Sequence, residues 1–339
     1  MRRYGDSPRL GEWMRVAQAA SVRDRPRQES VRTLFPLILC LAVAAHLAVS
    51  GVARGQIYVG NIGTNTIGAY TTAGATVNAA LVSGLGHPFA LAVAGTSLLV
   101  TDFFAGTISE YTTSGALVNP ALVSGLDDPR GLAVSDGHLF VTNFGSGTIG
   151  KYTLAGATVN AALVTGLNGP WGLAVSGTDL FVANYGDNSI GAYTTGGATV
   201  NAALVTGLNA PEGLAVSGGN LFVANFGGNT IGKYTTGGAT VNAGLIGGLA
   251  GPAYVAVLGD DLFVTSRSNR IAQYTTAGAT VNAALVTGLS VPEGIAVVPE
   301  PTPLALCLGW IVVLLARRPR CFTPSARACG AGDRARSGW

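Results

Sequence analysis

An internal repeat of 41 residues constrains the fold of this chain more than any other feature of its sequence. An apolar triplet such as Leu-Phe-Val begins at positions 57, 98, 139, 180, 221 and 262. A tyrosine follows each triplet, and each boundary between units carries a proline: Pro88, Pro129, Pro170, Pro211, Pro252 and Pro292. The sequence therefore predicts six copies of one structural unit.

Each unit is predicted to form four short β-strands separated by turns rich in glycine and asparagine. In the fifth copy, the apolar residues 221–224 do not alternate with polar ones, so this strand must be covered on both faces. The strands of that copy are expected at 213–218, 220–225, 230–236 and 240–249. Six units of four strands indicate an all-β chain folded as a six-bladed β-propeller.

An open solenoid is the rival interpretation, and the ends of the repeat region distinguish the two. The repeat region begins at 56–61, which corresponds to the second strand of a unit, and ends at 294–298, which corresponds to the first strand of a further unit. In a ring, this last strand completes the first blade, whereas in a solenoid it has no partner. We therefore expect a closed propeller over residues 56–298.

The unit resembles the NHL-type propeller repeat. The resemblance covers about 240 residues and implies a fold more than a function, because such propellers serve as binding scaffolds, lyases and lactonases alike. In the fifth unit and its counterparts the matching residues are Pro211, Gly213, Leu214, Val216, Leu221, Val223, Asn225, Ile231 and Tyr234.

The N-terminal segment, 1–55, is typical of a secretory signal peptide with a long basic leader. Several arginines precede an apolar run at 34–49, which is expected to be helical and is followed by the small residues 51–53. Export fits the cysteine usage, since no cysteine falls between 56 and 298. The propeller is therefore expected to have neither disulfides nor a cysteine-ligated metal.

A second targeting segment is expected at 299–320. Its apolar run, 304–316, is thirteen residues long and would cover only about 20 Å of a bilayer core of roughly 30 Å. The segment resembles a PEP-CTERM sorting signal, carried by Pro299, Glu300, Pro301, Arg317 and Arg318. The resemblance implies an inner-membrane intermediate, an exosortase-type processing enzyme, and a final place at the cell surface among exopolysaccharide. The basic tail, 321–339, is expected to be disordered, and whether the anchor is removed stays open.

The charge of the repeat region argues against a nucleic-acid partner. Residues 56–298 hold 11 acidic and five basic residues, a net charge of −6. Nucleic-acid binding needs a clustered basic face.

Two positions vary among the six copies, and both are expected at one end of the disc. One is the residue after the boundary proline, and the other follows the Asn or Asp that ends the second strand. Aromatic rings among polar groups there would suit a polysaccharide or a protein. The candidate ligand-binding residues are Phe89, Arg130, Trp171, Glu212, Glu293, Phe103 and Tyr185.

Structural interpretations compete with this one. We expect Phe144, Tyr185 and Phe226 to pack between blades, and leave open whether Phe89 and Trp171 pack or bind. Two repeated asparagine positions are expected to stabilise turns rather than to form a ligand cage. They are Asn61, Asp102, Asn143, Asn184, Asn225 and Ser266, and Asn78, Asn119, Asn160, Asn201, Asn242 and Asn282.

Catalysis is not expected. Glu212 and Glu293 are interpreted as solvated surface residues, and His87 and His138 should lie at opposite ends of the disc. No metal or cofactor is predicted, because the acidic pairs lack the spacing of calcium loops. The first hypothesis is thus an exported binding or matrix-associated module. The alternatives are a lyase or lactonase using Glu212, Glu293 and His87, and a purely structural surface component.

Overall fold

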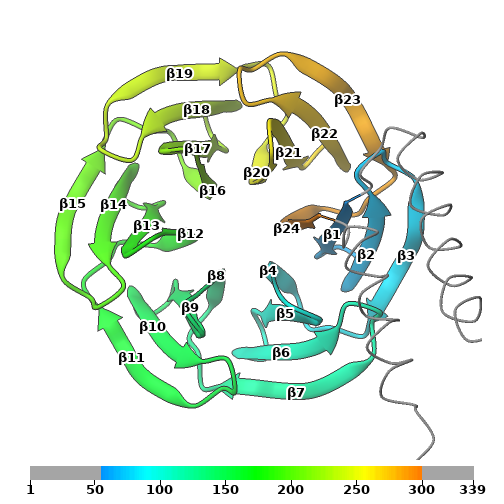
Figure 1. The fold of residues 1–339 in the computed structure, drawn as a ribbon, viewed down its shortest axis with the longest axis horizontal. Helices are drawn as coiled ribbons and strands as arrows, with labels where there is room; N and C mark the ends of the chain where they lie inside the picture. Colours follow the sequence, from blue (N-terminus) through cyan, green and yellow to red (C-terminus); the bar gives the residue numbers. More distant parts are fainter. Residues whose placement is uncertain (1–54, 300–339) are drawn as a thin grey trace, which may run out of the picture. The chain divides into compact units, whose positions relative to one another are not determined.

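The computed structural model describes residues 55–299, and every regular element in this part is a β-strand (Figure 1). The strands form six four-stranded sheets around a common axis, so the predicted all-β, six-bladed propeller is confirmed. The expected terminal helices, signal peptide, sorting segment and tail lie outside the described residues. Between residues 55 and 299, no helix is long and apolar enough to cross a bilayer.

The strands of each blade follow one another from the axis outward (Figure 1). Blade 1 contains β24 (Pro292–Val298), β1 (Gln56–Asn61), β2 (Thr66–Thr71) and β3 (Thr76–Ser83), and blade 2 contains β4 (Pro88–Ala94), β5 (Ser97–Asp102), β6 (Thr107–Thr112) and β7 (Leu117–Ser124). Blade 3 contains β8 (Pro129–Ser135), β9 (His138–Asn143), β10 (Thr148–Thr153) and β11 (Thr158–Val164), and blade 4 contains β12 (Pro170–Ser176), β13 (Asp179–Asn184), β14 (Ser189–Thr194) and β15 (Thr199–Val205). Blade 5 contains β16 (Pro211–Ser217), β17 (Asn220–Asn225), β18 (Thr230–Thr235) and β19 (Thr240–Ile246), and blade 6 contains β20 (Pro252–Leu258), β21 (Asp261–Ser266), β22 (Arg270–Thr275) and β23 (Thr280–Thr287).

The ring is closed by the first and last strands of the propeller. β24 pairs antiparallel with β1, with Gln56 opposite Val298 and Val59 opposite Ile295. The lone first strand predicted from the sequence therefore completes blade 1, and the solenoid is excluded.

Burial falls from the axis to the rim. In β17 the side chains of Leu221, Phe222 and Val223 are buried on both faces, as their unbroken apolar run predicts. The outermost strand of the same blade, β19, is exposed over its first five residues. Propeller stability thus rests on the inner three strands and the contacts between blades.

The inner strands β24, β4, β8, β12, β16 and β20 surround a region that we call the hub (Figure 1). Their third residue is glycine in four blades, because the neighbouring inner strand lies very close. A Cβ on Gly213, for example, would lie 2.6 Å from the Cα of Tyr254. In blades 2 and 6 this position holds Ala90 and Tyr254 instead. The tyrosine is the one large side chain in this series, and it shapes the hub.

The second asparagine ladder has the structural role expected for it. In each blade the Oδ1 of this asparagine accepts a hydrogen bond from the backbone amide two residues later, as Asn78 does from Ala80 at 3.1 Å. The same bond recurs at Asn119, Asn160, Asn201, Asn242 and Asn282.

Candidate functional site

Both variable positions lie at one end of the disc, as expected. The proline that begins each inner strand pairs with the last residue of the next strand, so Pro211 lies opposite Asn225 and Pro88 opposite Asp102. The residues that follow these two positions therefore meet at the same end of every blade. We call this end the variable face.

The variable face divides into two arcs around the hub. The aromatic arc, on blades 2 to 4, consists of His87, Phe89, Phe103, Phe104, Phe144, Trp171 and Tyr185. The carboxylate arc, on blades 5, 6 and 1, consists of Glu212, Arg267 and Glu293. Arg130 projects from blade 3 over the aromatic arc.

The aromatic arc is mostly packed rather than presented to solvent. Phe89 and Trp171 belong to the hydrophobic core and are only 5% and 6% exposed, so they do not form an open platform. Their rings meet edge to face at 5.8 Å between centroids. This settles in favour of packing the question that the sequence left open for these two residues.

The expected packing of the second-strand aromatics is confirmed. Phe144 and Tyr185 are half-buried and pack against the core, with Tyr185 5.1 Å from Trp171 between centroids. Phe103 packs in the same cluster. Phe226 is half-buried on the other arc, beneath the guanidinium of Arg267 at 4.6 Å.

One ring of the aromatic arc does face solvent, and the sequence interpretation missed it. Phe104, in the loop between β5 and β6, is 72% exposed. Its ring lies 5.1 Å from Phe103 and 4.9 Å from His87 between centroids. A sequence signal existed, because Phe104 stands where the other five copies have Gly or Ser.

Arg130 is held by ring faces and not by a carboxylate. Its guanidinium carbon lies 3.8 Å from the centroids of both Phe144 and Trp171, and 5.1 Å and 5.4 Å from those of Phe89 and Phe103. Among residues 55–299 it forms no ion pair, and its buried Nε has no hydrogen-bond partner. Burial lowers the pKa of Arg130, although Tyr254, Asp128 and the two glutamates oppose this change.

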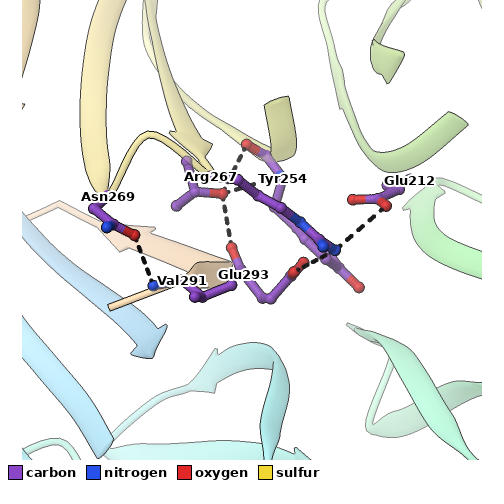
Figure 2. Close-up of polar contacts among 7 residues, drawn as sticks. Glu212, Tyr254, Arg267, Asn269, Val291 and Glu293 are labelled. Atoms are coloured by element: carbon purple, nitrogen blue, oxygen red, sulfur yellow. Dashed lines mark hydrogen bonds and ion pairs between the residues drawn. The ribbon is translucent and has the colours of Figure 1, made fainter. Parts of the chain in front are cut away.

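The carboxylate arc is buried, which corrects the expectation that its glutamates are solvated. Glu212 is 1% exposed and Glu293 0%. Figure 2 shows the side chain of Arg267 lying between them: a guanidinium nitrogen is 2.9 Å from Glu293 Oε1 and 3.7 Å from Glu212 Oε1. Glu212 and Glu293 are enclosed because the inner strands converge where these side chains lie. In a surface loop the same side chains would remain in water.

Enclosure changes the protonation of both carboxyl groups. Burial raises the pKa of Glu212 to about 9, with a further increase from the nearby Glu293. Burial also raises the pKa of Glu293 to about 7, and the guanidinium groups of Arg267 and Arg130 limit both increases. At neutral pH the pair therefore holds at least one proton, and Arg267 balances the remaining charge.

Tyr254 crosses the hub from blade 6 to blade 3. Its hydroxyl donates a hydrogen bond of 2.8 Å to the carbonyl oxygen of Arg130. Burial raises the pKa of Tyr254 well above its usual value, so the hydroxyl stays a donor. Tyr254 was not expected at the site, and its signal was the replacement of the glycine that four other copies carry at this position.

The two histidines are separated as predicted. His87 lies in the aromatic arc beside Phe89, Phe103 and Phe104, and burial lowers its pKa. His138 begins β9 at the opposite end of the disc, where it contacts the Asp136 carbonyl. His87 contacts rings and not the buried carboxylates.

The first Asn/Asp/Ser ladder contributes to local turns. Asp102 accepts hydrogen bonds from the amides of Gly86 at 2.5 Å and Ala105 at 3.1 Å, and Asn61 accepts one from Ser290 at 3.3 Å. Asn143 and Asn225 donate to threonine hydroxyls five residues later. The expected bonds to backbone amides are thus found at Asp102 and Asn61, whereas the buried Oδ1 atoms of Asn143, Asn184 and Asn225 have no hydrogen-bond partner among the described residues.

A shallow groove of about 300 Å³ adjoins the aromatic arc. It lies between blades 3 and 4 and is lined by Phe144, Asn168, Tyr185 and several glycines. Over residues 55–299, no three His, Cys, Asp or Glu side chains gather as ligands for a metal ion.

No protein-family profile and no curated protein matches the chain. Solved structures do match, at low sequence identity. A chain of a nidogen/laminin complex is 15% identical with a TM-score of 0.64, covering 72% of this chain and 98% of that one. A catalytically inactive virginiamycin B lyase from Staphylococcus aureus, crystallised with quinupristin, is 20% identical with a TM-score of 0.55, covering 73% and 92%. A gluconolactonase from Xanthomonas campestris is 16% identical with a TM-score of 0.53, covering 60% and 77%. At these identities the likeness establishes the six-bladed propeller and leaves the function to the site.

Proposed function

We propose that this chain is an exported binding module, and that its variable face holds an extracellular polysaccharide or protein. The observation that carries the proposal is the contrast between this face and the rest of the disc. The turns and outer strands repeat almost unchanged, whereas on the variable face Phe103 contacts both an exposed ring, Phe104, and the unpaired cation of Arg130. Aromatic and arginine side chains are the residue types enriched in binding surfaces.

The test is binding by the wild type and by variants that leave the core intact. Phe104→Ser and Arg130→Gln are suited to it, because Phe89 and Trp171 are core residues whose truncation would disturb the fold. Glycan arrays and pull-downs from the host's extracellular material should reveal a ligand that the double variant loses. Equal binding of the ligand by the double variant would show that the variable face is not the binding site. No saturable ligand at all would favour a purely structural surface component.

A second candidate is a lyase or lactonase, and one observation favours it. Glu212 and Glu293 have raised pKa values, and a carboxyl group protonated at neutral pH can act as a general acid. Several structural neighbours are enzymes of these classes. Turnover of lactone substrates, with and without divalent metal, tests this candidate, and activity unchanged in Glu212→Gln would exclude that residue from catalysis.

We further propose export, passage through the inner membrane and sorting by an exosortase-type enzyme, on the strength of the two terminal segments. Mass spectrometry of the mature protein from its host tests this directly. Ends near residues 53 and 299 would support both cleavages. A chain that retains residues 304–316 would point to a permanent anchor.

A further inference from the structure

The hub contains two arginines in opposite situations, and only one of them is available to a ligand. Arg267 is paired with Glu293 and Glu212, and its guanidinium also lies over Phe226. Arg130 has the rings of Phe144 and Trp171 on two adjacent sides and no anion within ion-pair distance among the described residues. The Phe144 and Trp171 rings lie 5.7 Å apart between centroids with an interplanar angle of 85°, so they bound the guanidinium on two adjacent sides and hold it in place, while its N–H groups stay available to a partner.

An oriented guanidinium edge matches a carboxylate. Its parallel N–H groups suit two oxygens of one planar group, and stacking on aromatic rings reduces the conformational entropy lost on binding. A partly desolvated cation without a partner gains more from an added anion than a fully hydrated one does. Because the rings already hold the Arg130 side chain in place, binding an anionic group costs little further conformational entropy.

The surroundings of Arg130 limit the charge that such a ligand can carry. The propeller has a net charge of −6 between residues 56 and 298, with Asp128 two residues before Arg130. A dense polyanion would be repelled by this field, whereas one isolated carboxylate would not. The ligand group is therefore expected to be a single carboxylate.

The exposed side chains beside Arg130 indicate what the carboxylate is attached to. Phe104 offers a bare hydrocarbon ring, 72% exposed, and Phe103 connects it to Arg130. Glu212, Glu293 and the Trp171 indole N–H, which could bind sugar hydroxyls, are buried, and the exposed polar side chains of Ser146 and Asn168 lie in the groove between blades 3 and 4. The bare ring of Phe104 itself fits an apolar side chain better than a polyhydroxylated sugar.

We propose that the aromatic arc binds a peptide segment of a partner protein in which one Asp or Glu lies beside an apolar residue. The carboxylate contacts the edge of Arg130, and the apolar side chain rests on Phe104. This inference rests on the proposed binding function and narrows its ligand to a protein. The groove beside Phe144 and Tyr185 gives the flanking peptide a path between blades 3 and 4.

The experiment uses an array of octapeptides that carry Asp or Glu beside Leu, Ile or Phe. Each peptide is printed next to a copy with Asn or Gln in place of the acid, and a glycan array is probed in parallel. The peptide with the strongest signal is then measured by fluorescence anisotropy with the purified protein. We expect the acidic peptide to bind at least about 10-fold more tightly than its amide copy, because the charge-assisted pair is lost in the copy.

Variants assign the effect to the residues. Arg130→Gln should weaken the acidic peptide about 30-fold, and Arg130→Lys should weaken it less, because it keeps the charge but loses the planar edge. Phe104→Ser should weaken the acidic peptide and its amide copy equally. Arg270→Gln in β22 removes the same charge elsewhere and should change nothing, and melting curves verify that all variants are folded.

Each remaining outcome overturns the inference in an identifiable way. Equal binding of acidic and amide peptides, or full binding by Arg130→Gln, would show that no carboxylate is read at Arg130. A glycan bound in place of peptides, and lost in Phe104→Ser and Arg130→Gln, would preserve the binding function while refuting the peptide. If the protein binds neither peptides nor glycans on the arrays, both the proposed binding function and this inference are refuted.

Discussion

The aromatic arc and the carboxylate arc enclose one arginine each, and they treat it differently. Arg130 is held by the faces of Phe144 and Trp171, whereas Arg267 is held by Glu293 and Glu212. Ring faces hold a cation in place without neutralising it, while carboxylates neutralise it and use up its hydrogen-bond donors. The aromatic arc therefore leaves the charge of Arg130 available to a ligand, whereas the carboxylate arc uses the charges of Arg267 and its glutamates to stabilise the hub.

The largest effect is expected from removing the arginine of the carboxylate arc. At pH 8, Arg267→Gln should destabilise the protein by about 2–3 kcal/mol, because it leaves a buried carboxylate without a partner. The value falls below that for a fully enclosed pair, since the Arg267 side chain is 39% exposed. At pH 5 both carboxyl groups are protonated, so the loss should be below about 1 kcal/mol.

Chemical denaturation at the two pH values measures this difference. Arg270→Gln, which changes the same charge in β22, serves as the control and should show no pH-dependent loss. Equal destabilisation at pH 5 and pH 8 would mean that Arg267 acts through packing alone.

The pH dependence of wild-type stability should reveal the buried carboxyl pair. The folded pKa values, about 9 for Glu212 and about 7 for Glu293, lie above that of an unfolded glutamate. The native state therefore binds more protons, and stability is greatest below about pH 4.5 and falls as the pH rises toward 9. The slope can reach about 1.4 kcal/mol per pH unit for each proton. Other groups add their own dependence, so the comparison is made with a variant.

Glu212→Gln removes one of the two groups and should flatten the fall in stability between pH 5 and pH 9. Asp260→Asn changes an exposed turn residue at the opposite end of the disc and should leave the slope as it is. Denaturant midpoints across this pH range provide the measurement. A slope identical in wild type and Glu212→Gln would show that Glu212 is ionised in the folded protein.

Tyr254 joins blade 6 to blade 3 across the hub through the hydrogen bond from its hydroxyl to the Arg130 carbonyl. Tyr254→Phe should cost about 1 kcal/mol, because a carbonyl oxygen loses its partner in a buried setting. Tyr193→Phe in β14 is a matched change away from the hub. If both changes lower the melting temperature equally, the hydrogen bond from Tyr254 to the Arg130 carbonyl contributes nothing specific to stability.

The smallest effect concerns the backbone in front of the carboxylate arc. Val291 precedes β24 with a φ of 48°, and its amide donates to Asn269 Oδ1 at 2.9 Å (Figure 2). A β-branched residue is strained in this region, whereas Gly169 and Gly251 occupy it elsewhere without strain. Val291→Gly should therefore stabilise the protein by roughly 0.5 kcal/mol. Destabilisation would show that the side chain contributes packing that outweighs the strain.

The fold could be predicted from the sequence because the repeat carries it redundantly. Six apolar second strands, six boundary prolines and the phase of the two ends each indicate a closed ring. The contents of the hub could not be predicted in the same way. Burial of Glu212 and Glu293 depends on how closely six inner strands converge, and each strand by itself resembles an ordinary strand that begins at the surface.

Departures from the repeat were the useful sequence signals for the site. Tyr254 replaces a glycine, Phe104 replaces Gly or Ser, and Arg267 replaces an aromatic or aliphatic residue. Their positions mark the hub, but their partners come from blades far apart in the sequence. Arg130 and Tyr254, for instance, are 124 residues apart.

The difference between the two arginines can be tested most directly by NMR of the guanidinium Nε–H groups. The Nε–H signals of Arg130 and Arg267 would be assigned with the two Gln variants and followed while propionate, a single small carboxylate, is added at pH 7. If Arg130 is free and Arg267 is paired, the Arg130 signal should shift saturably and the Arg267 signal should not move. A shift of Arg267 alone, or of neither arginine, would contradict the assignment of a free cation to the aromatic arc.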